Sequence, residues 1–156
     1  MLERFKGDAG KQLLIEVMSR QFVVEGDQGL AAAIAAIADL VEYKTGAHLM
    51  HQGDAEHDLY FILEGKFSIQ VNGEVISSRS AGEDIGEMAL IDPMTTRSAS
   101  AIALEDSVVA MIAEEDFTEL ANKYPKLWRA FARQQGNRLR QLNERLSDLQ
   151  SEYSKK

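Results

Sequence analysis

Apolar positions at the start of the chain recur at the three- and four-residue spacing of a helix. The first helical series consists of Leu13, Leu14, Val17, Met18 and Phe22. We expect this helix to end at Gly26. An alanine-rich stretch over residues 30–40 predicts a second helix, because alanine has the highest helix propensity. The first 40 residues are therefore predicted to be helical.

The period changes after Gly46, and residues 48–112 show short strands separated by turn signals. Residues 67–71 alternate apolar and polar side chains, as in a half-buried strand. Asn72-Gly73 follows, a strong hairpin signal because both positions tolerate a positive φ. The other apolar runs of this stretch are 59–63, 75–76, 99–103 and 108–112. Short strands at this spacing predict a small barrel or jelly roll.

The last part of the chain predicts helix again. A short helix is expected to begin at Asp116-Phe117, and a long one near Pro125, since proline is tolerated in a first helical turn. The long helix carries a series that steps by four and three residues: Trp128, Ala132, Gln135, Leu139, Leu142, Leu146 and Leu149. Such a seam either packs on the chain's own barrel or joins two chains. We favour a homodimer, because the leucines extend beyond what one small barrel can cover.

The length and composition of the chain indicate one domain with a substantial core. It has 156 residues, of which 45% are hydrophobic and 27% charged. The predicted fold class is α+β: a β-roll or jelly-roll barrel with N-terminal helices and a long C-terminal helix. We divide it into a helical extension (1–29), the β-roll with flanking helices (30–126) and a dimerisation or lid helix (127–156) that leads to a missing effector domain.

Charge and cysteine content exclude several classes of function. The net charge of −8 argues against a partner that is a polyanion, although residues 129–156 carry seven basic and three acidic side chains. The absence of cysteine excludes disulfides, thiol catalysis and zinc-thiolate sites. No signal segment or apolar run of about 18 residues is present, so we expect a cytoplasmic domain without a membrane partner. No nucleophile and base stand at usable spacing, which predicts that this chain has no catalytic residues.

The most informative segment is residues 82–100, GEDIGEMALIDPMTTRSAS. Gly86 lets the backbone approach a ligand, and a short turn over residues 87–90, which include Met88 and Ala89, aims N–H groups at an anion. Arg97 offers a planar set of donors to a phosphate, and Ser98 adds a hydroxyl. Glu87 accepts hydrogen bonds only, which suits a ribose hydroxyl and repels a second phosphate. Together these groups predict a site for a singly charged phosphate diester attached to a sugar.

Other interpretations of these residues exist. Glu87 and Arg97 would form a plain ion pair in one of them, and Glu83, Asp84 and Glu87 would hold a divalent ion in another. Arg97 competes for Glu87 in the second case, so no metal site is predicted. His48, His51 and His57 surround a glycine-bounded loop and are interpreted as solvated or hydrogen-bonded side chains.

Residues 82–100 resemble the phosphate-binding cassette of cyclic nucleotide-binding domains, the superfamily of the bacterial catabolite activator and the kinase regulatory subunits. Residues 53–65 are similar to the family's early strands, and the resemblance covers about 30–149. It implies a cyclic nucleotide-binding β-roll in which Glu87 accepts from the ribose 2′-hydroxyl and Arg97 neutralises the cyclic phosphate. Ser98 and the amides of Gly86 and Ala89 would complete the phosphate site.

The long helix differs from the family pattern. Purine-binding members place hydroxyl residues on it, and the matching positions here fall near Leu142 and Asn143. Leu142 has no hydrogen-bonding group, which permits a pyrimidine ligand. Arg129, Arg133 and Asn143 are candidate lid residues. The family's transcription factors continue into a helix-turn-helix, which this chain lacks, so no DNA partner is expected.

A narrower resemblance comes from the N-terminal extension, from GEMALIDP and from residues 124–129. They are similar to the sensor domain of bacterial effectors that join a cyclic nucleotide-binding domain to a C-terminal TIR domain. Such effectors serve anti-phage Pycsar systems, in which a cyclase makes cyclic CMP or cyclic UMP and the TIR domain destroys NAD. The resemblance implies a cyclic pyrimidine ligand for this chain and no other cofactor.

Two other functions compete with this hypothesis. The chain would be the regulatory domain of a truncated transcription factor that responds to cyclic AMP or cyclic GMP, or a barrel that only dimerises and binds no ligand. A thermal-shift panel of cyclic nucleotides separates the three.

Overall fold

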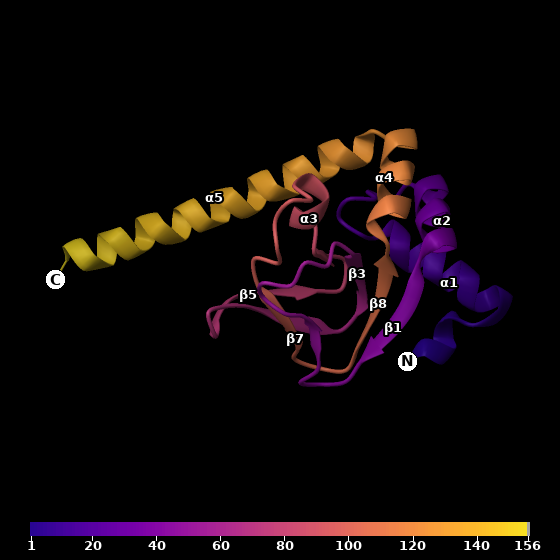
Figure 1. The fold of residues 1–156 in the computed structure, drawn as a ribbon, viewed down its shortest axis with the longest axis horizontal. Helices are drawn as coiled ribbons and strands as arrows, with labels where there is room; N and C mark the ends of the chain where they lie inside the picture. Colours follow the sequence, from indigo (N-terminus) through magenta and orange to yellow (C-terminus); the bar gives the residue numbers. More distant parts are fainter. Residues whose placement is uncertain (156) are drawn as a thin grey trace.

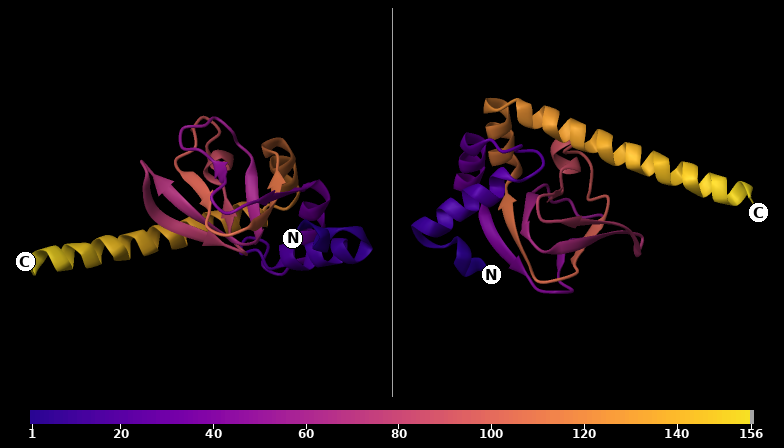
Figure 2. Two further views of the ribbon diagram at one scale, coloured as in Figure 1. Left: turned by 90° about the horizontal axis from the view of Figure 1, so that it is seen from below. Right: turned by 180° about the vertical axis from the view of Figure 1, so that it is seen from behind.

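Two four-stranded antiparallel sheets form the centre of the computed structural model, which describes residues 1–155. One sheet has the order β1-β8-β3-β6 and the other β2-β7-β4-β5. The strands are β1 (Asp39–Tyr43), β2 (His48–Met50), β3 (Leu59–Glu64), β4 (Lys66–Val71), β5 (Glu74–Ser80), β6 (Asp84–Ile85), β7 (Ser100–Ala103) and β8 (Ser107–Ile112). The sheets curl into a roll, with the N-terminal helices gathered on one side and the long C-terminal helix crossing the roll and extending past its other side (Figures 1 and 2).

The helices complete an α+β fold, as the sequence predicts. They are η1 (Leu2–Phe5), α1 (Gly7–Ser19), α2 (Gln28–Ile37), α3 (Met88–Ile91), α4 (Glu114–Lys123) and α5 (Lys126–Ser154). Side chains of α1, α2, α4 and α5 share one buried cluster with β3 and β8. Within it, the Phe117 ring meets Trp128 and Phe131 edge to face at centroid distances of 5.8 and 5.4 Å. A second buried cluster fills the interior of the roll.

The N-terminal prediction is wrong in two places. The first helix ends at Ser19 rather than Gly26, and the turn that follows is held by Gln21, whose buried Nε2 donates to the Ile62 carbonyl at 2.8 Å. The second helix ends at Ile37, and Leu40 lies in β1, which pairs with β8. Leu40 continues the apolar stripe of the helix, so the spacing alone concealed the change to a strand.

The strand predictions agree with the roll. Asn72 and Gly73 both have positive φ, +52° and +81°, in the turn that joins β4 to β5. The sequence missed β6, because two residues are too few for an alternating pattern. β6 nevertheless matters for the site, since it lies within the cassette and leads directly to Gly86 and Glu87.

Helix α5 has a buried first part and an exposed second part. Leu127, Ala130, Phe131 and Gln134 are buried, whereas every residue from 139 to 155 is exposed. The helix crosses the roll beside α3 and then projects away from it (Figure 1). The leucines of the heptad series at 139, 142, 146 and 149 are 51–60% exposed, so this chain's own roll does not cover them.

Candidate ligand-binding site

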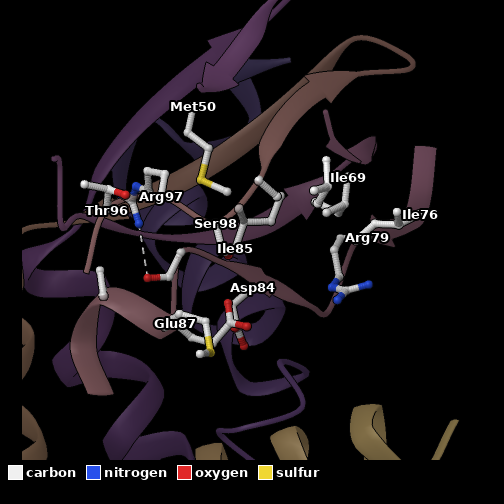
Figure 3. A pocket seen from close by; sticks show the side chains of 15 residues that line it. Met50, Ile69, Ile76, Arg79, Asp84, Ile85, Glu87, Thr96, Arg97 and Ser98 are labelled. Carbon is white, nitrogen blue, oxygen red and sulfur yellow. Dashed lines mark hydrogen bonds between the residues drawn. The ribbon is translucent and has the colours of Figure 1, made fainter. Parts of the chain in front are cut away.

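A cavity of about 300 Å³ opens inside the roll (Figure 3). All six residues predicted to bind ligand line it: Gly86, Glu87, Met88, Ala89, Arg97 and Ser98. The sequence analysis gave no ligand-binding role to the other lining residues, which are Met50, Ile69, Val71, Ile76, Arg79, Asp84, Ile85, Thr96 and Ala99. Most of these residues lie on strands. There the alternation of apolar and polar residues indicates which side chains point inward, but not which of them surround a cavity.

Gly86 occupies a position that only glycine fits. Its φ is +95°, in the left-handed region, and a Cβ there would lie 2.7 Å from the Asp58 carbonyl oxygen and 2.8 Å from Nη1 of Arg97. Both approaches are closer than van der Waals contact allows. The glycine therefore lets the cassette backbone pass directly against the arginine.

Arg97 is buried, with 4% of its surface exposed. Nη2 donates to the Asp58 carbonyl at 2.7 Å and Nη1 to the Gly86 carbonyl at 3.2 Å, the dashed line of Figure 3. The Nε atom is buried and has no hydrogen-bond acceptor among the described residues. Within residues 1–155 the guanidinium has carbonyl partners but no carboxylate partner, so its charge is not neutralised.

Glu87 does not pair with Arg97, so the ion-pair interpretation of these two residues is wrong. Its Oε1 accepts instead from Arg138 Nη1 at 2.7 Å and from Gln135 Nε2 at 2.9 Å, both on α5. Oε2 accepts no hydrogen bond from residues 1–155. One oxygen of this cavity-lining carboxylate is thus held by the helix while the other stays available to a hydroxyl.

The first turn of α3 supplies unused donors. The amides of Met88 and Ala89 form no hydrogen bond within the described part of the chain, whereas Leu90 N donates to the Glu87 carbonyl at 3.1 Å. Amides at the start of a helical turn are available to an anion. Both residues line the same cavity as Arg97.

Asp84 ties the roll to α5. Its side chain is buried, and Gln134 Nε2 lies 3.0 Å from each of its carboxylate oxygens. Burial and then the nearby charge of Glu87 raise the pKa of Asp84 to about 7, against the opposing effects of Arg138 and Gln134. This carboxyl therefore differs from Glu87 in lacking an ion pair, a difference that no sequence pattern indicates.

The candidate lid residues lie elsewhere. Arg133 forms an ion pair with Glu25, and neither it nor the exposed Arg129 and Asn143 lines the cavity. The α5 residues that contact the cassette region are Gln134, Gln135 and Arg138. A signal for this existed, because Gln135 interrupts the heptad series and such a polar residue commonly has a specific partner.

The histidines and acidic residues form no metal cluster in the described part of the chain. His57 Nδ1 lies 3.0 Å from Glu114 Oε2, and the rings of His48 and His51 stack with centroids 4.4 Å apart. None of the helices within residues 1–155 is long and apolar enough to cross a membrane.

Comparison with known proteins assigns the family. The sequence pattern of the cyclic nucleotide-binding domain matches residues 40–124. The chain belongs to this family. The resemblance inferred from the cassette is thereby confirmed.

Relatives of this cyclic nucleotide-binding domain include two named Pycsar effectors. The chain is 43% identical over 144 residues to Pycsar effector protein BcPycTIR of Burkholderia cepacia, covering 92% of this chain and 48% of that protein. It is 36% identical to XpPycTIR of Xanthomonas perforans, covering 92% and 47%. The chain thus spans about half the length of these relatives.

A solved structure supports the fold independently. The crystal structure of the Thermus thermophilus catabolite activator protein matches with a TM-score of 0.68 and 28% identity, covering 79% of this chain and 59% of that chain. The β-roll with flanking helices is therefore the family fold.

Proposed function

We propose that this domain is a cytoplasmic sensor of a cyclic pyrimidine mononucleotide, cyclic CMP or cyclic UMP. The observation that carries the proposal is Arg97, a buried guanidinium without a carboxylate partner among the described residues, in one cavity with unused amides and a half-used carboxylate. Burying a charge is costly unless an opposite charge compensates it. A ligand with one negative charge supplies that compensation.

Each group has a place in the proposed complex. The cyclic phosphate binds Arg97, Ser98 and the amides of Gly86, Met88 and Ala89. The ribose 2′-hydroxyl donates to the open oxygen of Glu87, which leaves its bonds to α5 intact. The base lies toward the strands that carry Ile69 and Ile76, which line the cavity.

Two observations favour a pyrimidine. The relatives with the identities given above are named Pycsar effectors, and the sequence resemblance implies cyclic CMP or cyclic UMP for such proteins. Leu142, near the helix position where purine-binding members carry a hydroxyl, is 51% exposed and offers neither donor nor acceptor. A pyrimidine base is smaller than a purine base and therefore needs fewer contacts with α5.

Signal transfer is proposed to run through α5. Gln134, Gln135 and Arg138 connect this helix to Asp84 and Glu87 beside the cavity. Because Glu87 is bonded to α5, each orientation of its side chain corresponds to a position of the helix. A ligand that binds one of these orientations more tightly increases the population of the matching helix position. The moved helix then reorients a C-terminal TIR domain that degrades NAD during phage infection, so this chain regulates the reaction without catalysing it.

The proposed sensor acts as a homodimer. The exposed leucines of α5 repeat at heptad spacing, and a second copy of the same helix presents a matching surface. Two sensor domains joined in this way would bring two effector domains together.

A thermal-shift panel of cyclic AMP, GMP, CMP and UMP tests the proposal. Ligand at a hundredfold excess over its Kd stabilises the folded state by about 2.7 kcal/mol, so cyclic CMP or cyclic UMP raises the melting temperature. Arg97→Met removes charge-assisted hydrogen bonds worth roughly 1.5–3 kcal/mol each, and we expect calorimetry to show a loss of at least about 2 kcal/mol.

The matched control is Arg20→Met, which removes an exposed arginine of the turn after α1 and leaves the cavity unchanged. Arg97→Lys keeps the charge without the planar donors and should bind weakly. A melting temperature that no cyclic mononucleotide raises would contradict the proposal, and a clear preference for cyclic AMP would contradict its pyrimidine part.

A further inference from the structure

The cavity contains a second arginine, Arg79 on β5. In the register of β4 and β5 it stands opposite Phe67, which is fully buried, and cross-strand partners point to the same face. Its side chain therefore belongs to the interior of the roll. Arg79 lies outside the cassette, and nothing in the cassette pattern points to it.

Arg79 has donors that the protein leaves unused. Nη1 donates to Ser77 Oγ at 2.6 Å and to the Ser78 carbonyl at 3.0 Å. Nε and Nη2 form no hydrogen bond with residues 1–155, and no carboxylate of that range lies within 4.0 Å. Burial, followed by the charge of Arg138, lowers the pKa of the Arg79 guanidinium. A partly buried guanidinium with unused donors therefore gains more binding free energy from an acceptor on the ligand than an exposed guanidinium does.

The positions of the two arginines orient a nucleotide in the cavity. Figure 3 shows Arg97 and Arg79 on opposite sides, with Glu87 between them and Ile76 beside Arg79. With phosphate at Arg97 and ribose at Glu87, the base reaches the Arg79 side. The apolar surfaces of Ile69 and Ile76 suit its flat faces.

We propose, on the basis of the function proposed above, that Arg79 donates to a carbonyl oxygen of the base and selects pyrimidines over adenine. Arginine has five N–H donors and no acceptor. Uracil offers two carbonyl oxygens, and cytosine offers a carbonyl oxygen beside a ring nitrogen acceptor. Adenine has no carbonyl oxygen, and its ring acceptors N1 and N7 both stand beside the amino group, whose hydrogens oppose those of the guanidinium.

A second phosphate on the ligand is a less suitable partner for Arg79. Glu83 and Glu87 lie close enough to influence its ionisation, and their charges repel a phosphate but not a neutral carbonyl. The cavity of about 300 Å³ is also at the small end of the ligand sites of proteins, roughly 300–1,000 Å³. It fits one mononucleotide better than two.

Calorimetric titration of the wild type and of Arg79→Met with cyclic UMP, cyclic CMP and cyclic AMP tests the inference. The wild type should bind at least one cyclic pyrimidine about tenfold or more tightly than cyclic AMP, the effect of one charge-assisted hydrogen bond. Arg79→Met should lose most of this preference by weakening the pyrimidine while leaving cyclic AMP nearly unchanged. Arg97→Met should weaken all three ligands together.

Arg20→Met is the control for loss of an arginine outside the cavity, and it should keep the preference. If Arg79→Met melts too low for titration, Arg79→Lys replaces it and should retain only part of the preference. Unchanged pyrimidine selectivity in a folded Arg79 variant overturns the inference but leaves the sensor function intact. Failure of the wild type to bind any cyclic nucleotide overturns both.

Discussion

Gly86 shows how strongly a single residue determines the geometry of the cavity. Its carbonyl accepts from Arg97, its φ of +95° is unfavourable for any side chain, and the space for a Cβ is already occupied. These three facts have one cause: the cassette backbone must pass close to the guanidinium of Arg97 for Arg97 to donate to the Gly86 carbonyl. The sequence predicted a close approach of the backbone to a ligand at this glycine, and the structure adds the arginine contact that requires it.

We predict that Gly86→Ala lowers stability and removes ligand binding. The left-handed backbone costs about 1–2 kcal/mol for an L-residue, and relief of the clash displaces Arg97 from the Asp58 and Gly86 carbonyls. Chemical denaturation measures the first effect and calorimetry with cyclic UMP the second.

Gly46→Ala provides the matched comparison. Gly46 also has a positive φ, +88°, but a Cβ there meets nothing within 4 Å. This variant should show the stability loss of the backbone alone and bind ligand normally. Equal ligand affinities for the two alanine variants would contradict the proposed role of the close approach.

At the scale of elements, two short segments decide how α5 sits on the roll. β6 places Asp84 under Gln134, and the turn into α3 places Glu87 under Gln135 and Arg138. All three helix side chains come from one stretch of just over a turn. α5 is thus attached to the roll by polar contacts at the edge of the cavity, in addition to the apolar packing of its first residues.

The buried Asp84 gives this attachment a pH dependence. Because its pKa is raised from 3.8 to about 7 in the folded protein, the folded state binds more protons than the unfolded chain between these values. The contribution of Asp84 to stability is therefore fully present below about pH 4 and is lost as the pH rises through about 7.

Asp84→Asn isolates this effect. We expect the urea midpoint of the wild type to fall relative to that of the variant between pH 4.5 and 7.5, since asparagine does not titrate. Asp8→Asn, at an exposed carboxyl of α1, serves as the control and should follow the wild type. Parallel pH profiles of wild type and Asp84→Asn would contradict the raised pKa.

Alternation and turn signals predicted most strands, because each depends on neighbours in sequence. They failed at β1, where Leu40 continues the helical stripe, and at β6, which has only two residues. The cassette predicted the phosphate and ribose groups for the same local reason. The inward position of Arg79 and the contact of Asp84 with α5 depend on cross-strand register and helix packing, which involve distant parts of the chain and leave no local pattern.

On the scale of the whole molecule, the exposed leucines of α5 require explanation. Four apolar side chains at heptad spacing face solvent on a helix whose opposite positions are polar. The first residue of the heptad series, Trp128, packs against Phe117 in the chain's own core. The beginning of the series therefore contributes to the fold of the single chain. Only its second part offers a surface to another helix.

We predict that Leu142→Glu combined with Leu146→Glu converts a dimer to a monomer. Two carboxylates at seam positions would face their counterparts in the partner helix without compensation. Sedimentation velocity at several protein concentrations measures the change. Ser147→Glu, an exposed position of the same helix outside the seam, should remain dimeric, whereas a wild-type chain that sediments as a monomer would contradict the proposed homodimer.

The buried contacts of α5 lie in its first half. Beyond Arg138, one exposed hydrogen bond within residues 1–155, from Arg145 Nη1 to the Ile76 carbonyl at 3.2 Å, still joins it to the roll, so that breaking this bond frees the rest of the helix to move as a rigid arm. The helix contains 29 residues, or about 43 Å at 1.5 Å per residue, and the 16 residues beyond Arg138 extend over about 24 Å. A tilt of about ten degrees at the cavity would move Ser154 by about 4 Å, roughly the separation of two touching side chains. A shift at Glu87 too small to disturb the core would therefore be large enough, at the far end, to make or break a contact.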